Sequence, residues 1–500
     1  MDAAASSAQR LRHVRDLPCP RGLPFIGNLH QLNAPRLHRV LEQWAAELGT
    51  PYRFQICGMP VTVWSDAELS QSVMRERPHR YRRYASLEPV LAEIGCNGVF
   101  SAEGAAWEPQ RRLVMQALSI PHIRAFYPTL QAITARLNDR WQRAAERGDV
   151  VEMTDDLKRY TVDVTSALAF GEDPRTLEQE RGVIQEQLAQ IFPTLMHRVN
   201  APFPYWRYVR LPRDRRTDRA LAEVHRTIRG MMARSRERMR DEPSDAPRHL
   251  LEAMLALRDD PDSEPGSEVS DDIIAANVLT LLLAGEDTTA NALAWSLYYL
   301  AADEPLQQRL ADEAHAVLGA HAVCPDYGLV KDLDLFEAVC SETLRFRPVA
   351  AIMAFEPIEN VQVGGVALPA GSKMFFLTRP PMLDARHYSQ PEHFDPDRWL
   401  RGQAGGAVRV DEARVHDPRA WVQFGAGPRV CPGRHLAAME MRLVLSMLMN
   451  RFNVKLAVDP ATIEEITAFA MVPNRMPVRL EMRPTVESSR PQTTDQPGRD

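Results

Sequence analysis

The sequence has neither a long apolar run nor a surplus of basic charge. Its 60 Lys and Arg residues against 66 Asp and Glu leave a net charge of −6 over 500 residues, so we expect no nucleic-acid partner. No uninterrupted apolar run reaches the ~18 residues of a membrane-spanning helix, so we expect no integral membrane segment. Residues 1–17 (MDAAASSAQRLRHVRDL) lack an apolar core, so we expect neither a signal peptide nor an N-terminal anchor.

Cysteine is also scarce, with six residues scattered along the chain. They are Cys19, Cys57, Cys96, Cys324, Cys340 and Cys431. This spacing fits neither a metal finger nor a dense disulfide scaffold, and it is typical of proteins in a reducing compartment. We therefore expect a soluble, cytoplasmic protein.

A glycine-rich loop over 421–435 (WVQFGAGPRVCPGRH) contains one cysteine, Cys431. The segment 435–450 is rich in Leu, Met and Ala, which predicts a helix that begins just after this cysteine. The free N–H groups and the dipole of a helix N-terminus lower the pKa of a thiol and favour the metal-binding thiolate. For a lone cysteine, the alternative is a buried structural side chain.

Five residue types in this loop follow the pattern Phe-x-x-Gly-x-Arg-x-Cys-x-Gly, with Phe424, Gly427, Arg429, Cys431 and Gly433. This pattern resembles the cysteine-ligand loop of the cytochrome P-450 haem-thiolate enzymes. The resemblance implies that the Cys431 thiolate is the axial ligand of haem b (iron protoporphyrin IX). It also implies that Phe424, Arg429 and Gly433 contact this cofactor.

A second feature is a predicted helix of ~30 residues from Ser270, its N-cap, to about Leu300, a length of about 45 Å. It is apolar on nearly all sides, which indicates a central, buried helix. The segment 284–289 (AGEDTT) lowers the stability of such a helix, because it places acids, hydroxyls and a glycine in the middle of a buried helix. A hydroxyl that bonds back to the carbonyl four residues earlier can open a helical turn and seat a water.

The same segment resembles the oxygen-activation motif of the family, in which an acid and the next threonine deliver protons during oxygen activation. Asp287 and Thr288 match that pair, and Ala284 offers a small side chain beside the iron.

Trp107 and Arg111 lie four residues apart in a predicted helix over 104–118 and therefore share a face. Alone, the pair is typical of surface packing with a cation–π contact. The spacing is similar to the family's Trp-x-x-x-Arg pair, which binds a haem propionate. A buried carboxylate needs such cationic partners.

Glu342 and Arg345 lie one helical turn apart, and such ion pairs are commonplace in helices. In the family, the pair joins a downstream arginine in a buried triad that fixes the cysteine loop. Arg398, in the segment 394–399 (FDPDRW), matches the third member, so we expect a structural role for all three.

The chain departs from the family pattern at Phe355, where many members have a propionate-binding arginine. We expect the propionates to rely on Trp107, Arg111 and Arg429, or on a residue that the sequence does not identify. Two roles are open for the arginine-rich segment 207–219. It is either a solvated basic face or a binding surface for an acidic substrate or carrier protein.

We expect a mainly α fold with a small β portion, a single large cytochrome P-450-like domain. Its predicted limits are 17–483, between a flexible N-terminus over 1–16 and a disordered tail over 484–500. A helix over 37–48 and a β-hairpin over 52–64 are expected early in the domain.

The resemblance implies a monooxygenase that inserts one oxygen atom from O2 into a C–H or C=C bond of an apolar small molecule. The stretch after Cys431 is too short for a fused flavin or iron–sulfur domain, so we expect a separate ferredoxin or flavodoxin with its reductase. The alternatives are a haem-thiolate isomerase, dehydratase or peroxygenase, and a non-catalytic helical protein that binds apolar ligands. Steroid, fatty acid, terpene, polyketide and peptide substrates all stay open.

Overall fold

The fold is mainly helical with a small β portion, as predicted, and the strands in the described part of the chain form four small sheets. The computed structural model describes residues 11–178, 203–243, 247–259, 269–400, 417–468 and 470–484, with a few residues between 191 and 201. The described helices are α1 (Leu37–Leu48), α2 (Ala67–Arg75), α3 (Leu87–Glu93), α4 (Trp107–Ala117), α5 (Ile120–Arg147), α6 (Met153–Phe170), α8 (Pro212–Asp241), α9 (Leu250–Asp259), α10 (Asp271–Leu300), α11 (Glu304–Leu318), α12 (Asp334–Phe346), α13 (Arg379–Met382) and α14 (Arg434–Arg451).

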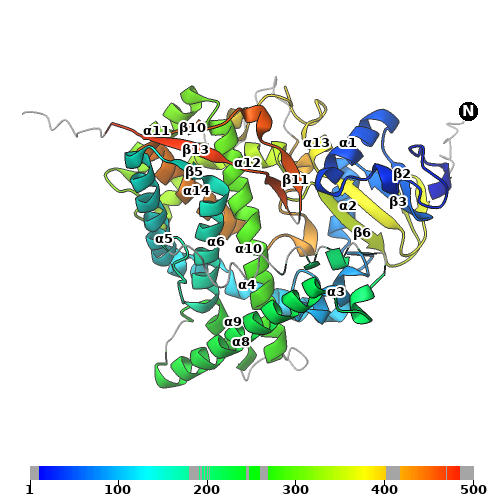
Figure 1. The fold of residues 1–500 in the computed structure, drawn as a ribbon, viewed down its shortest axis with the longest axis horizontal. Helices are drawn as coiled ribbons and strands as arrows, with labels where there is room; N and C mark the ends of the chain where they lie inside the picture. Colours follow the sequence, from blue (N-terminus) through cyan, green and yellow to red (C-terminus); the bar gives the residue numbers. More distant parts are fainter. Residues whose placement is uncertain are drawn as a thin grey trace, which may run out of the picture.

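The strands form sheets of five, three, three and two members. They are β1 (Arg12–His13), β2 (Tyr52–Ile56), β3 (Met59–Trp64), β4 (Tyr81–Arg82), β5 (Val150–Glu152), β6 (Ile352–Pro357), β7 (Val361–Val363), β8 (Val366–Leu368), β9 (Lys373–Leu377), β10 (Phe452–Leu456), β11 (Glu465–Thr467), β12 (Met471–Pro473) and β13 (Pro477–Met482). The largest sheet has the order β2-β3-β9-β6-β4 and lies at one end of the molecule (Figure 1). The predicted hairpin is its β2–β3 pair, with Gln55 opposite Pro60.

Helix α10 runs through the centre of the molecule, as its apolar composition predicts (Figure 1). The Ser270 side chain caps it by accepting a hydrogen bond from the Ile273 N–H at 3.3 Å. The helix stays α-helical through Gly285, so the motif does not open a turn. The glycine has a packing reason, because a Cβ atom there would lie 2.4 Å from the Thr165 Cγ2 atom of α6.

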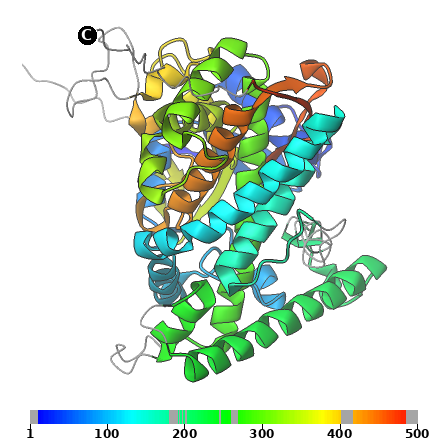
Figure 2. The ribbon, with the colours of Figure 1, turned by 90° about the vertical axis from the view of Figure 1, so that its left-hand side faces the viewer.

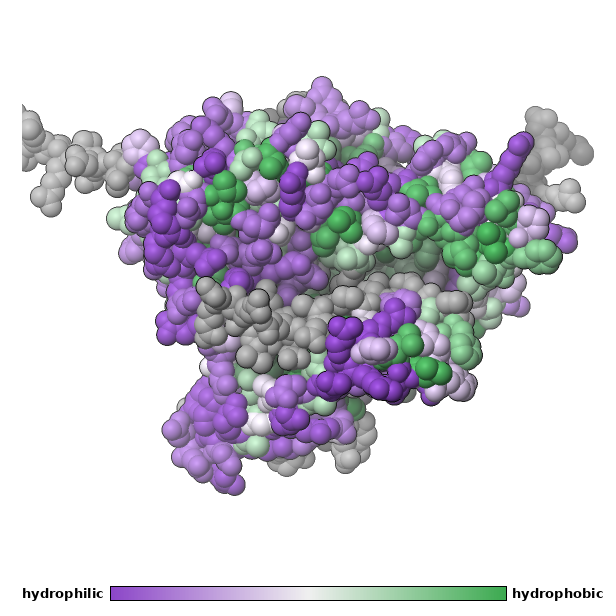
Figure 3. Space-filling view, viewed as in Figure 1, coloured by the Kyte–Doolittle hydropathy of each residue, from purple (hydrophilic) through white to green (hydrophobic). Residues whose placement is uncertain are grey.

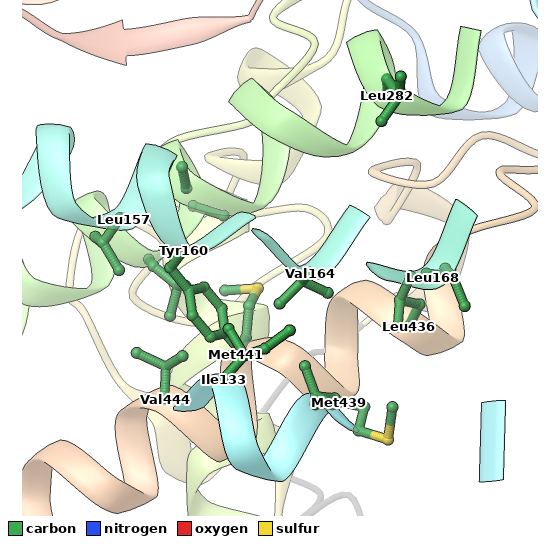
Figure 4. Packing of buried hydrophobic residues seen from close by; sticks show 14 of the residues in the cluster. Ile133, Leu157, Tyr160, Val164, Leu168, Leu282, Leu436, Met439, Met441 and Val444 are labelled. Atoms are coloured by element: carbon green, nitrogen blue, oxygen red, sulfur yellow. The ribbon is translucent and has the colours of Figure 1, made fainter. Parts of the chain in front are cut away.

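Helix α14 packs against α5 and α6 on the same side of the core. Figure 4 shows its apolar side chains facing those of the other two helices. The contact contains Leu436, Met439, Met441 and Val444 of α14, Leu157, Tyr160, Val164 and Leu168 of α6, and Ile133 of α5. This burial fixes the start of α14, and with it the cysteine loop, relative to the core.

Regular structure begins early in two segments of the chain. Arg12 and His13 form β1 and pair with Val366 and Ala367, so the flexible N-terminus does not extend to residue 16. Helix α8 begins at Pro212, so the second half of the arginine-rich segment is helical (Figure 2). Residues 1–10 and the tail from 485 lie outside the described part of the chain.

Among the described helices, only α10 is long and apolar enough to cross a membrane, with a mean hydropathy of 1.3 in its most apolar window. That window is 67% buried within the protein, which is the pattern of a core helix. Exposed apolar side chains gather instead on the side of the β2–β3 hairpin (Figure 3). They include Leu23, Phe25, Ile26 and Met59.

Candidate active site

The loop that carries Cys431 is held by its own backbone and by α2. The Cys431 N–H donates to the Phe424 carbonyl at 2.8 Å, and Gly427 has a φ of +69° that other residues rarely adopt. A Cβ atom on Gly427 would lie 2.6 Å from the Cα atom of Arg75, so the loop lies directly against the end of α2. Helix α14 follows with Gly433 as its N-cap, as predicted.

The environment of the Cys431 thiol has opposing effects on its pKa. Burial raises the pKa, and this outweighs the backbone N–H groups of Gly433 and Arg434 and the charges of Arg111 and Arg434, which lower it. The prediction of a net lowering by the helix N-terminus is therefore wrong for the protein alone. A bound metal cation would supply the missing stabilisation of the thiolate.

Helix α10 presents one partly exposed stripe in its otherwise buried middle. Leu281, Ala284, Gly285 and Thr288 form it, at the three- and four-residue spacing of one helix face. The Thr288 hydroxyl donates to the Ala284 carbonyl at 2.8 Å, which is the back-bonding expected from the sequence. The stripe is therefore apolar apart from one hydroxyl whose oxygen can still accept a hydrogen bond.

Asp287 lies beside this stripe and forms an ion pair with a residue that the sequence did not indicate. Its Oδ1 atom is 3.2 Å from the Nζ atom of Lys158 on α6. Burial, followed by the charge of Asp287, raises the pKa of the adjacent Glu286 to about 8, although Lys158 acts in the opposite direction. Glu286 is thus mainly protonated at neutral pH, next to a charged pair.

A cationic cluster surrounds Trp107, which is 4% exposed at the start of α4. The Arg429 guanidinium lies 4.4 Å from the centroid of its indole ring and donates to Glu103 at 2.5 Å. Arg111 is near enough to Cys431 for the two charges to interact, while burial lowers the pKa of its guanidinium. The structure thus places Trp107 with Arg429, and Arg111 towards the thiol.

Glu342 stands at the centre of the predicted triad. Its side chain is fully buried, and it accepts from Arg345 at 2.8 and 2.9 Å and from Arg398 at 3.1 Å. The Trp399 indole N–H, at 2.8 Å, and the Asp395 backbone N–H, at 2.8 Å, also donate to this carboxylate. All the groups that a buried carboxylate requires are present, and they join α12 to the segment before the cysteine loop.

The residues present fit a haem. The Nε and Nη1 atoms of Arg429 are buried and have no hydrogen-bond partner among the described residues, as expected of a guanidinium that faces a carboxylate of a cofactor. Among the residues that the structure describes, no cluster of three or more His, Cys, Asp or Glu side chains could hold a bare metal ion. A single thiolate suits iron whose other ligands come from a porphyrin.

Comparisons with known proteins agree with this site. A family model described as Cytochrome P450 matches residues 17–480. The protein LUTEIN DEFICIENT 5, chloroplastic, of Arabidopsis thaliana is 25% identical over 79% of this chain and 65% of its own length. The 25-hydroxyvitamin D-1 alpha hydroxylase, mitochondrial, of Mus musculus is 26% identical over 93% of this chain and 92% of its own.

Among solved structures, the haem domain of cytochrome P450DA superposes with a TM-score of 0.81. It is 24% identical and covers 94% of this chain and 98% of its own, which shows the common fold. The chain belongs to the cytochrome P450 family. It is a monooxygenase that binds haem b through a cysteine thiolate and uses O2 and a redox partner.

Proposed function

We propose that this monooxygenase inserts oxygen into a C–H or C=C bond of an apolar small molecule, with Asp287 and Thr288 as its proton-handling pair. The observation that carries the proposal is the arrangement on α10. The Thr288 hydroxyl is fixed on the partly exposed stripe, and the Asp287 carboxylate beside it is paired with Lys158. Proton transfer to reacting oxygen needs a positioned donor and a route that restores it.

The cofactor site follows from the same residues. Haem bound through the Cys431 thiolate supplies the iron at which O2 is activated. Trp107, Arg111 and Arg429 provide polar and cationic groups for its carboxylates, while Phe424 and Gly433 flank the thiolate in the loop. Ala284 keeps the facing side of α10 small, so that a flat ligand can approach the helix backbone.

Two catalytic side chains handle protons. The Thr288 hydroxyl donates to the Ala284 carbonyl. Its oxygen is therefore oriented to accept a hydrogen bond from a water molecule on the open side of the stripe. The Asp287 carboxylate exchanges protons with solvent, because its side chain is 19% exposed and that of Lys158 is 34% exposed. Because the rest of this part of the helix is buried and excludes water, protons reach the site through Asp287.

The substrate would lie between the stripe and the start of β6. Ile352, Met353 and Ala354 are partly exposed there, in a chain segment that is otherwise buried. The Met471 N–H donates to the Val349 carbonyl at 2.9 Å, which fixes the start of β12 beside this segment. These aliphatic side chains favour an apolar substrate.

We further propose that electrons come from a separate ferredoxin or flavodoxin with its reductase, and that the protein is cytoplasmic. All six cysteines are free thiols, which is typical of a reducing compartment. Arg434, partly exposed at the start of α14, offers a positive group near Cys431 to an acidic donor. Reduction by a panel of purified ferredoxins and flavodoxins would identify the donor.

A spectrum and a labelling experiment test the function. The purified holoprotein should give the red-shifted band of a ferrous–CO thiolate haem, and an apolar ligand library should contain compounds that shift the iron spin state. With such a compound and a competent donor, product formed under 18O2 should contain one labelled oxygen atom. Absence of the band contradicts the thiolate site, and unlabelled product contradicts monooxygenation.

A further inference from the structure

Arg77 is a buried cation whose ion pair with Glu103 is long and leaves N–H groups unused. It lies two residues beyond α2, is 3% exposed, and its Nε and Nη2 atoms have no hydrogen-bond partner among the described residues. The Nη2 atom of Arg77 lies 3.7 Å from Oε1 of Glu103, which is beyond hydrogen-bond distance. A buried guanidinium with two unused N–H groups is costly unless a ligand completes it.

The surroundings of Arg77 place it beside the cysteine loop. Gly427 lies against Arg75, so the end of α2 and the loop are fixed to each other. Glu103 links the two parts again, since it accepts from Arg429 and lies near Arg77. The unused groups of Arg77 and Arg429 therefore belong to one cluster.

That cluster has a surplus of positive charge. Burial lowers the pKa of Arg77 well below its usual range, and the charges of Arg83 and Arg429 lower it further. The charge of Glu103 acts on all three guanidinium groups, and its carboxylate also accepts from the Arg83 backbone N–H at 3.1 Å. Glu88 adds a second negative charge near Arg429 and Arg111 adds a further positive one, so the guanidinium groups still outnumber the carboxylates.

Phe355 explains the position of Arg77. The Arg77 guanidinium lies 4.7 Å from the centroid of the Phe355 ring, and that ring is 2% exposed. An aromatic ring at this position of β6 supports a neighbouring guanidinium by a cation–π contact, whereas an arginine would repel it. A guanidinium from the chain after α2 therefore lies against β6 at the position of Phe355.

We propose that Arg77 is a haem-carboxylate ligand that, with Arg429 and the charge of Arg83, takes over the role of the arginine absent at position 355. This inference rests on the proposed haem site, and it assigns to this chain a cofactor contact that its motifs do not contain. Arg77 would donate from Nε and Nη2 in the fork geometry that suits a carboxylate.

The test measures how firmly haem is held. In the holoprotein, transfer of haem to excess apomyoglobin should be about ten- to hundredfold faster in Arg77→Gln than in the wild type. The ferrous–CO thiolate band should persist, because Cys431 is unchanged. An Arg77→Gln holoprotein that keeps this band and releases haem at the wild-type rate overturns the inference, but leaves the proposed function intact.

Two further variants separate a direct contact from loss of packing. Arg198 is also 3% exposed and lies over an aromatic ring, that of Trp206, at 5.6 Å, so Arg198→Gln is the matched control. It should release haem at the wild-type rate, and an equal acceleration would overturn the inference. The double variant Arg77→Gln/Phe355→Arg has a guanidinium at position 355 of β6 in place of the one at position 77. Haem loss should be slower in it than in Arg77→Gln, and a rate equal to that of Arg77→Gln counts against the contact.

If Arg77→Gln yields no holoprotein, Arg77→Lys decides the matter. Lysine keeps the charge but loses the fork of donors, so haem loss should be faster than in the wild type. An unchanged rate in this variant would overturn the inference.

Discussion

Lys158 of α6 and Asp287 of α10 form an ion pair of 3.2 Å across a close contact between the two helices. Gly285 permits this contact, because it brings the α10 backbone close to Thr165. The pair connects the proposed proton-handling residue to a partly exposed cation. We therefore expect Lys158 to affect turnover without contact with the haem.

Lys158→Met should lower turnover severalfold and increase the solvent isotope effect, because the Asp287 carboxylate loses the counter-charge that holds it in place. Lys158→Arg is the matched control and should keep most of the activity. Steady-state rates in H2O and D2O, at matched saturation with donor protein, check this. Equal rates in the Met variant and the wild type would contradict a role of the pair in proton supply.

Thr288→Ala should uncouple the enzyme, since the hydroxyl on the open stripe of α10 is lost. Consumption of electrons from the donor system should continue, product should fall by about tenfold or more, and peroxide should appear in its place. Thr289→Ala is the control, because Thr289 is 5% exposed and lies off the partly exposed stripe. An isomerase or peroxygenase would keep its activity in the Thr288 variant, and that result would contradict monooxygenation.

Arg398→Ala should yield protein with little haem. It leaves the buried Glu342 carboxylate with one fewer cation, at a cost of about 3–5 kcal/mol in the free energy of unfolding. Arg36→Ala is the comparison, because its ion pair with Glu464 is half exposed on both sides and contributes about 0–1 kcal/mol. Haem-to-protein absorbance and urea unfolding measure both effects, and equal values for the two variants would contradict the structural role.

Gly285→Ala should destabilise the protein by about 1–3 kcal/mol, because the added methyl would overlap Thr165 Cγ2. The same change at Gly230, in α8, meets only a flexible arginine end at 3.6 Å and should stabilise by up to about 1 kcal/mol. Thr165→Ser removes the clashing methyl and should recover much of the loss in the double variant. Additive effects of the two changes would show that the contact is not the cause.

Glu440 should make stability depend on pH. Burial raises its pKa from 4.5 to about 8, and its Oε2 atom has no partner among the described residues. The folded state therefore holds a proton that the unfolded chain releases between these values, so unfolding becomes easier as pH rises through this range. The slope is at most about 1.4 kcal/mol per pH unit.

Glu440→Gln removes that titration. The difference in unfolding free energy between this variant and the wild type should move in favour of Gln from pH ~5 to pH ~8. Taking the difference cancels the contribution of Glu286, whose pKa is also raised to about 8 and which is present in both proteins. A difference that stays flat over this range for Glu440→Gln would contradict the raised pKa.

Local patterns were enough to predict much of the molecule. The bounds of α1 and the start and end of α10 follow from periodicity, the Ser270 cap and the proline after Glu304, which are all short-range signals. The Cys431 loop and the 284–289 segment are likewise local, since a handful of residue types at fixed spacing define them. This is why the sequence alone indicated a haem-thiolate oxygenase.

Tertiary structure decided what depends on residues far apart in the chain. The partner of Asp287 is Lys158, on another helix, and no spacing along the sequence could reveal it. Burial also reversed the expected net effect on the Cys431 pKa, because desolvation depends on everything packed around the thiol. The Arg77 guanidinium meets the Phe355 ring only because the end of α2 and strand β6 pack together around the same site.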